Sequence, residues 1–283
     1  MRDLTKLGYT KDTPKKAARF KLIKGAGATH SSAASSESLE GPILDQNDTG
    51  SCTGHGTSQW MEVTYAFFKK PLPFRPSPKG IYALTRAYDR LASVGPGQPL
   101  PAFTDSGGMP ADIVVAVAAL GIRALVMPSP LGFQSDVDTS NVTQEEKLGD
   151  LESDYAELLG AAQKIDPTDS SFQANLAAAI EKNGAAAVGI FVDTGFENYS
   201  PASGPIQTIN QNDPNGGGHW LAVTSFRTAT AADEQHGIKA GELIFRGPNS
   251  WTPQWGDAGH WEMSGACLVT TCSDAYTLAL TPA

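Results

Sequence analysis

The chain has 283 residues, a net charge of −9, 40% hydrophobic residues and 18% charged residues, a composition typical of an ordinary globular protein. No apolar run approaches the roughly 20 residues that a membrane helix needs, and the N-terminal residues lack the apolar core of a secretory signal. We therefore expect a protein that is cytoplasmic as synthesised, with any export or particle association by a route the chain does not encode. We expect no membrane and no nucleic-acid partner.

The N-terminal 41 residues differ from the remainder in charge and in composition. Residues 1–30 hold eight Lys or Arg against two Asp, a net charge of +6, which leaves −15 for the remainder. Residues 25–41 are small, polar and aperiodic, as is typical of a flexible linker. We expect residues 1–41 to form a basic flexible arm, most simply a solvated tail, with ordered structure beginning near Pro42. An arm that lies against the acidic body is the alternative.

Helical patterns dominate the next part of the chain. Trp60, Val63 and Phe67 recur at helical spacing, so a helix is predicted to begin at or just after Cys52. Further helices are predicted at residues 78–92, 110–120, 151–163 and 171–183. Gly184 is predicted to close the last of them.

The C-terminal part changes to short, β-rich runs separated by Gly, Pro, Asn and Asp. These runs span residues 185–193, 219–226, 241–247 and 266–272. A helical half followed by a strand-rich half predicts an α+β fold with two lobes, divided as residues 42–165 and 166–283. If 266–272 is a strand, Cys267 and Cys272 point to opposite faces, which favours free thiols over a disulfide.

Cys52 is the strongest candidate for a reactive residue. A thiol becomes a nucleophile as a thiolate, and a helix N-terminus and a nearby imidazolium both lower its pKa. His55 is close in sequence, but a base one turn along the same helix leaves little room for a substrate. His219 follows the glycine run at 216–218 and is the favoured base, whereas His30, His236 and His260 are most simply surface or packing residues.

Two amide side chains complete a chemical hypothesis. An imidazole needs a partner that fixes its tautomer, and the side-chain carbonyl of Asn249 can supply one. Trp251 can cover that hydrogen bond and exclude water from it. Gln46, six residues before Cys52, can direct an N–H group at a developing oxyanion.

Four separated motifs then resemble one family, the papain-like cysteine peptidases, closest to the bacterial branch that lacks the usual disulfides. They occur in the family's order and extend over residues 42 to about 263. They are Asp45–Gln46 with Gly50–Ser51–Cys52; Ser106–Gly107–Gly108–Met109–Pro110; Gly217–Gly218–His219; and Asn249–Ser250–Trp251 with the segment 255–261.

The resemblance implies a helical left lobe and a β-barrel-like right lobe, with the active site in the cleft between them. It implies a Cys-His-Asn triad and an oxyanion hole, formed by Cys52, His219, Asn249 and Gln46. It also implies substrate binding by Gly107, Gly108, Met109, Pro110 and Gly218, with Trp251 and Trp255 as supporting core residues. It implies peptide or protein substrates and no metal or other cofactor.

Several features depart from the family's pattern. Thr49, Thr53 and Thr252 stand where a cysteine, an aromatic residue and a glycine are usual, and insertions are expected at 131–170 and 227–241. Alternatives to peptide-bond hydrolysis are another amide or isopeptide hydrolysis by the same triad, and a non-catalytic binding module. Because the arm is short and polar, deletion of residues 1–40 is expected to leave activity broadly intact.

Overall fold

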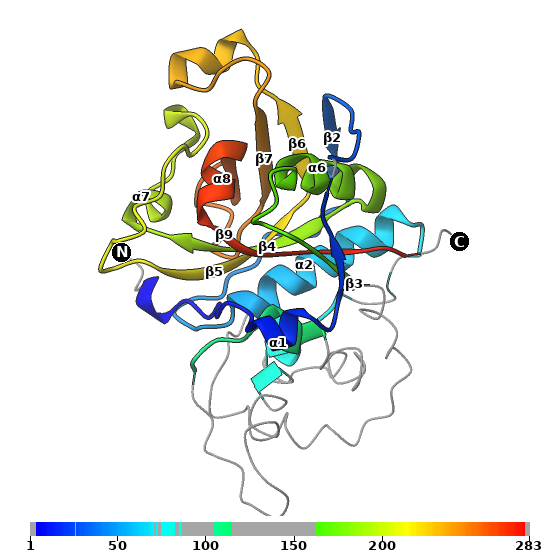
Figure 1. The fold of residues 1–283 in the computed structure, drawn as a ribbon. Helices are drawn as coiled ribbons and strands as arrows, with labels where there is room; N and C mark the ends of the chain where they lie inside the picture. Colours follow the sequence, from blue (N-terminus) through cyan, green and yellow to red (C-terminus); the bar gives the residue numbers. More distant parts are fainter. Residues whose placement is uncertain are drawn as a thin grey trace, which may run out of the picture.

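The computed structural model describes residues 4–25, 27–70, 72, 75–82, 85–86, 105–114 and 162–280. Within these ranges two sheets and one long helix make the framework (Figure 1). Residues 78–82, 85–86 and 110–114 are helical, as the sequence predicts. The remainder of those two predicted helices, most of 151–163 and most of the 131–170 insertion lie outside the described residues.

Helix α2 (Cys52–Phe67) begins at the predicted cysteine and is buried on nearly all sides. Its two early glycines explain this burial. A Cβ atom on Gly54 would overlap the Pro78 carbonyl, and one on Gly56 would press on the backbone of Trp220. Glycine weakens a helix by up to about 1 kcal/mol relative to alanine, but here it lets α2 pack directly against backbone.

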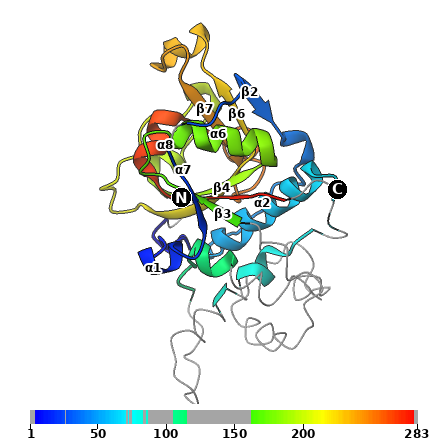
Figure 2. The same ribbon diagram turned by 45° about the vertical axis from the view of Figure 1, so that its right-hand side comes forward.

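The larger sheet has five strands in the order β1-β3-β9-β4-β5. Strand β1 pairs parallel with β3, and the other neighbours pair antiparallel. Helices α2 and α6 lie on opposite faces of this sheet (Figures 1 and 2). The strands span Lys21–Ile23 (β1), Ala162–Ile165 (β3), Cys272–Leu278 (β9), Ala186–Val192 (β4) and Gly217–Val223 (β5).

The second sheet has four strands in the order β2-β6-β7-β8. Only Thr224 separates β5 from β6, so the chain passes directly from one sheet into the other. The strands span Ala33–Ser35 (β2), Ser225–Thr228 (β6), Leu243–Pro248 (β7) and His260–Ser264 (β8). The main core joins this sheet to β4 and to helix α6 (Phe172–Asn183), which Gly184 closes at φ 82° as predicted.

The predicted strand at 266–272 is wrong. Residues Gly265–Thr271 form helix α8, and the strand follows as β9. The helix begins because the Ser264 side chain accepts a hydrogen bond from the Cys267 amide, which is an N-cap that outweighs the β-branched composition. Cys267 and Cys272 therefore lie on different elements, and both are free thiols, as is Cys52.

Short elements connect these parts. They are η1 (Leu4–Lys6), α1 (Pro14–Ala17), η2 (Glu37–Leu39), α7 (Thr194–Glu197), η6 (Pro201–Ser203) and η7 (Ala231–His236). Element η7 lies within the predicted 227–241 insertion, where Arg227 forms two hydrogen bonds with Asp233. No helix among the described residues has both the length and the apolar character for crossing a membrane.

The N-terminal arm differs from its expected solvated, flexible form. Strand β1, just before the 25–41 segment, pairs with β3, and strand β2, in the middle of that segment, pairs with β6, so the arm is tied to the body at two places. Before β1, the chain passes beneath the sheets beside α2 (Figures 1 and 2). Ordered structure thus begins well before Pro42. The arm contains few hydrophobic residues, which suggested a solvated segment. It is held on the body instead by backbone hydrogen bonds and by buried ion pairs such as Asp12–Lys164.

Candidate active site

Cys52 is the first residue of helix α2 and is fully buried. The backbone amides of Trp220, Gly8 and Thr53 act on its sulfur and favour the thiolate. Burial is nevertheless the larger effect and raises the pKa of the Cys52 thiol to about 12. The helix N-terminus alone therefore does not give the low thiol pKa that the sequence suggested, and Gly8, a residue of the arm, takes part in covering the sulfur.

His219 lies on β5, directly before the Trp220 amide that contacts the Cys52 sulfur. Its Nε2 and the Asn249 side-chain oxygen are 2.8 Å apart, and both residues are fully buried. The same oxygen accepts a second hydrogen bond from the Ser250 amide at 2.8 Å. Because a carbonyl oxygen only accepts, the contact requires a proton on Nε2, which leaves Nδ1 as the nitrogen that can exchange a proton with a thiol.

Aromatic rings enclose the His219–Asn249 hydrogen bond. Trp251 stacks on the imidazole with ring centroids 4.8 Å apart and an interplanar angle of 22°. Phe196 of α7 contacts the same ring edge-on at 6.2 Å and also stacks on Trp255. Trp251 is 3% exposed. These rings exclude water from the hydrogen bond, which strengthens it. Phe196 had no motif in the sequence to identify it.

The predicted substrate-binding glycines face an extended backbone, which belongs to the chain's own arm. The Gly108 amide donates to the Gly8 carbonyl, and the Thr10 amide donates to the Gly108 carbonyl at 3.0 Å. On the opposite side the Tyr9 amide donates to the Gly218 carbonyl at 3.2 Å. Residues 8–10 therefore lie between Gly108 and Gly218. These contacts agree with the alternative that the arm lies against the body, and the effect of its deletion on activity stays a prediction.

Met109 contacts a later part of the arm, at Lys16. The Lys16 ammonium is 3.4 Å from the Met109 sulfur and forms an ion pair with the buried Asp112. Pro110 is buried at the start of the described helical residues 110–114. The wall predicted to line a substrate pocket is thus in contact with helix α1 of the arm.

Gln46 is fully buried and is held from the opposite lobe. Its side-chain oxygen accepts a hydrogen bond from the Ser250 hydroxyl at 2.6 Å, and its Nε2 donates to the Thr49 carbonyl at 2.7 Å. Its backbone amide donates to the Ser250 carbonyl at 2.9 Å. An amide nitrogen carries two hydrogens, so one remains for a further acceptor. Ser250 fixes which end of the amide carries the donor.

If Gln46 is the oxyanion donor that the resemblance implies, replacing it with alanine is expected to lower kcat about 10²- to 10³-fold, the usual cost of one such donor. Replacing Ser250 with alanine is expected to lower kcat by about fivefold to tenfold, the equivalent of one hydrogen bond. Steady-state peptide hydrolysis measures both effects. Ser58→Ala is the matched control, because its hydroxyl donates to the Pro76 carbonyl and has no contact with Gln46. Equal losses in Ser250→Ala and Ser58→Ala would contradict this role of Ser250.

His55 is buried in the first turn of α2 and its Nδ1 is 2.9 Å from the Ser51 carbonyl oxygen. Burial lowers the pKa of His55 to about 4, so this imidazole is neutral at physiological pH. A neutral ring held by its own helix gives no charge to a thiolate. These contacts favour the packing role that the sequence left open for His55.

Asp105 connects the loop before Cys52 to the turn at Gly107, and the sequence analysis did not identify it. The Gly50 amide donates to both carboxylate oxygens of Asp105, at 3.1 and 2.9 Å. The Tyr82 hydroxyl donates to the same carboxylate and accepts from the Gly107 amide. Gly107 has φ +75°, a conformation that favours glycine. Asp105 thus sets the position of the loop before Cys52.

Thr252 departs from the family's usual glycine and adopts a glycine-like conformation, with φ 72°. A β-branched residue in the left-handed region costs of order 1–3 kcal/mol, so the surrounding contacts must hold it there. The Thr252 amide donates to the Leu44 carbonyl, next to the Asp45–Trp251 bridge.

Among the described residues, no group of three or more His, Cys, Asp or Glu side chains is arranged to hold a metal ion.

Comparisons with known proteins give a fold. No protein-family model matches the chain. No curated protein matches it in sequence either. The solved structure of xylellain, a cysteine protease from Xylella fastidiosa, is 17% identical with a TM-score of 0.65, and the match covers 99% of this chain and 98% of xylellain.

Two further structures have the same fold. Digestive procathepsin L 3 from the larval midgut of Tenebrio molitor is 17% identical with a TM-score of 0.62, and the match covers 98% of this chain and 77% of that one. Procathepsin B from Trypanosoma congolense is 13% identical with a TM-score of 0.60, and the match covers 99% and 87% of the two chains. The predicted fold class is therefore confirmed: this chain has the α+β fold of the papain-like cysteine proteases.

Proposed function

We propose that the protein is a cysteine endopeptidase that hydrolyses peptide bonds through a thioester acyl-enzyme. The observation that carries the proposal is the buried 2.8 Å hydrogen bond between His219 and Asn249. The residue after His219 on β5 is Trp220, and its backbone amide contacts the sulfur of Cys52. A thiol at a helix N-terminus, a base and an orienting group, from three separate parts of the sequence, support acyl-transfer chemistry.

In the first half-reaction His219 accepts the thiol proton at Nδ1, and the Cys52 sulfur bonds to the substrate carbonyl carbon. The oxyanion of the tetrahedral intermediate accepts hydrogen bonds from the remaining Nε2 hydrogen of Gln46 and from the Cys52 backbone amide. His219 then returns the proton to the departing amine as the C–N bond breaks. The product of this half-reaction is a thioester on Cys52 and a free amine.

In the second half-reaction a water molecule loses a proton to His219 and attacks the thioester carbonyl carbon. The second tetrahedral intermediate collapses with cleavage of the C–S bond, and the thiolate recovers the proton from His219. Asn249 holds the ring in one tautomer throughout, so Nδ1 faces the reacting atoms in both halves. The products are a carboxylic acid and the free thiol, and no cofactor is consumed.

Two alternatives to peptide-bond hydrolysis remain to be separated by experiment. The same triad can hydrolyse another amide or an isopeptide bond, and a module that only binds needs no reactive thiol. A peptidyl epoxide that alkylates thiols separates binding from catalysis, because alkylation requires an activated sulfur beside a peptide-binding groove. A peptide library then separates peptide bonds from other amides.

The expected result is one epoxide adduct per chain, located on Cys52 by peptide mapping after mass spectrometry and formed slowly because Cys52 is fully buried. Cys52→Ala is expected to remove the adduct, and His219→Ala to slow its formation strongly, because the thiol then has no base beside it. Cys267→Ala is the matched control, since that buried free thiol lies on α8. Labelling of Cys267 or Cys272 in place of Cys52 would contradict the proposal.

A further inference from the structure

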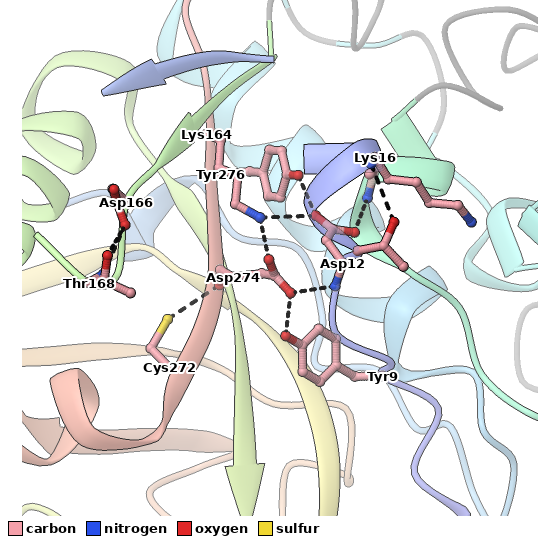
Figure 3. Close-up of polar contacts among 11 residues, drawn as sticks. Tyr9, Asp12, Lys16, Lys164, Asp166, Thr168, Cys272, Asp274 and Tyr276 are labelled. Atoms are coloured by element: carbon pink, nitrogen blue, oxygen red, sulfur yellow. Dashed lines mark hydrogen bonds and ion pairs between the residues drawn. The ribbon is translucent and has the colours of Figure 1, made fainter. Parts of the chain in front are cut away.

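A buried lysine on strand β3, Lys164, lies between two carboxylates that come from opposite ends of the chain (Figure 3). Its ammonium group contacts Oδ1 of Asp274 on β9 and is 3.2 Å from Oδ2 of Asp12. The side chains of Lys164, Asp12 and Asp274 are 9%, 0% and 1% exposed. Taking charges out of water is costly, and the attraction between them offsets that cost only in part. An amine and two carboxyl groups are thus held in contact where solvent is excluded.

The five-stranded sheet fixes the position of the lysine relative to Asp274. Strands β3 and β9 are antiparallel neighbours, with Lys164 directly opposite Tyr276. Asp274 precedes Tyr276 by two positions, so both side chains lie on the same face of the sheet. The Lys164 Nζ is also 5.1 Å from the centroid of the Tyr276 ring. Groups held in this way can reach effective concentrations of about 10⁵–10⁸ M, which favours a condensation that is unfavourable between free molecules in water.

The two carboxylate oxygens of Asp274 have different partners. Its Oδ2 accepts hydrogen bonds from the Tyr9 hydroxyl at 2.5 Å and from the Asp12 backbone amide at 2.9 Å. Its Oδ1 is the oxygen that contacts the Lys164 ammonium. Two fixed donors on one oxygen stabilise the negative charge that develops there in a tetrahedral intermediate. Oδ2 is therefore placed as the oxygen that stays, and Oδ1 as the oxygen that leaves.

The Asp12 carboxyl group is placed to carry protons. Its Oδ2 faces the Lys164 Nζ and also accepts from the Tyr276 hydroxyl, and its Oδ1 accepts from the Ala111 amide at 2.9 Å. Burial, and then the nearby Asp274 carboxylate, raise the pKa of Asp12 above its ordinary value. A carboxyl group with a raised pKa can both accept and release a proton near neutral pH.

We propose that Lys164 and Asp274 condense to an intramolecular amide cross-link between β3 and β9, with Asp12 as the group that carries the protons. The proposal goes beyond the proposed function and does not rest on it, because no residue of the candidate active site takes part. The new bond closes a loop between two residues 110 positions apart in the sequence. A cross-link of this kind constrains the unfolded chain, as a disulfide does, but cannot be reduced.

The reaction balances without an oxidant, a reductant or a second substrate. The Lys164 ammonium first gives one proton, through the Asp12 carboxyl group, to Oδ1 of Asp274, which leaves a neutral amine beside a neutral carboxylic acid. The Nζ lone pair then bonds to Cγ of Asp274, and the negative charge develops on Oδ2. A second proton passes from Nζ through Asp12 to Oδ1 as the Cγ–Oδ1 bond breaks and one water molecule leaves. The product is a neutral amide whose carbonyl oxygen keeps the donors from Tyr9 and Asp12.

The mass of the unmodified full chain tests the proposal directly. After denaturation under reducing conditions, its mass is expected to be lower than that of its sequence by one water molecule. Trypsin does not cleave after an acylated lysine, so digestion is expected to give a branched peptide in which residues 148–182 and 247–283 are joined through Lys164 and Asp274. Absence of this branched peptide would overturn the proposal. A branched peptide that joins Lys164 to residues 12–15 would overturn it as well, because the bond would then be to the other carboxylate.

Three variants of the full chain test the roles of the individual groups. Lys164→Arg is expected to have its full sequence mass, because a guanidinium keeps the charge but offers no free amine. Asp12→Asn is expected to have its full sequence mass too, since a carboxamide does not carry the protons. Lys16→Arg is the matched control and is expected to keep the water loss, because it changes the lysine that pairs with Asp112.

Near-UV circular dichroism shows whether each variant is folded, and the mass of the unmodified chain decides the outcome where a variant is not. A water loss that persists in Lys164→Arg would overturn the cross-link, and one that persists in Asp12→Asn would overturn the role of Asp12. None of these readouts requires peptide hydrolysis, so an inactive chain with the branched peptide would contradict the peptidase alone.

Discussion

His219→Ala is expected to lower kcat/KM for peptide hydrolysis about 10⁴-fold or more. The imidazole is the group proposed to accept the thiol proton and to protonate the leaving amine, and its loss removes both steps. Cys52→Ala is expected to cost as much, because no nucleophile remains. Each rate is measured with a fluorogenic peptide at substrate concentrations well below KM.

The double variant Cys52→Ala/His219→Ala gives the sharper comparison. Residues that act as one unit are not additive, so the double variant is expected to be no slower than either single variant. His236→Ala is the matched control, since it removes an imidazole from the short element η7. Additive losses, or a His219→Ala enzyme within tenfold of its parent, would show that another group is the base.

Alkylation of Cys52 in the unmodified chain is expected to rise with pH and to show no plateau up to pH 10. Burial raises the pKa of the Cys52 thiol to about 12. At pH 7 the thiolate fraction is then about 10⁻⁵, against about 3% for a free cysteine with a pKa of about 8.5. The rate of iodoacetamide addition, assigned to Cys52 by peptide mapping, is expected to increase about tenfold per pH unit.

The sign of the accompanying stability change follows from the same pKa. Above about pH 8.5 the thiol of the unfolded chain loses its proton while the folded chain keeps it, so stability falls as pH rises.

The urea-unfolded chain is the control for the alkylation experiment. The pH dependence of its Cys52 alkylation is expected to show a midpoint near the pKa of a free cysteine, about 8.5. A plateau below about pH 9 in the folded chain would show that the thiol ionises with the arm in place.

Local signals were sufficient for the elements that hold the candidate site. Helix α2 begins at Cys52 because apolar residues recur every three or four positions from there, and α6 ends at Gly184 because glycine accepts a positive φ. The strand run that begins at His219 and the run that precedes Asn249 were recognisable from their β-rich composition. The division into lobes at 42–165 and 166–283 stays a prediction.

Signals that depend on distant partners were not readable. Helix α8 was predicted as a strand because its residues are β-branched, whereas the Ser264 cap decides its conformation. The arm was predicted as solvated because it is polar. Its polar groups are buried by partners more than 90 residues away, such as Lys164 and Asp274 for Asp12. No window of sequence contains both members of such a pair.

The parallel pairing of β1 with β3 has a consequence for how firmly the arm stays on the body. Residues 21–23 fix the arm to the sheet only nine positions after Asp12, so residues 8–10 remain at an effective concentration of about millimolar order near Gly108 and Gly218 even when their hydrogen bonds open. Dilution of the protein therefore does not separate the arm from the body, since re-formation of these contacts is intramolecular.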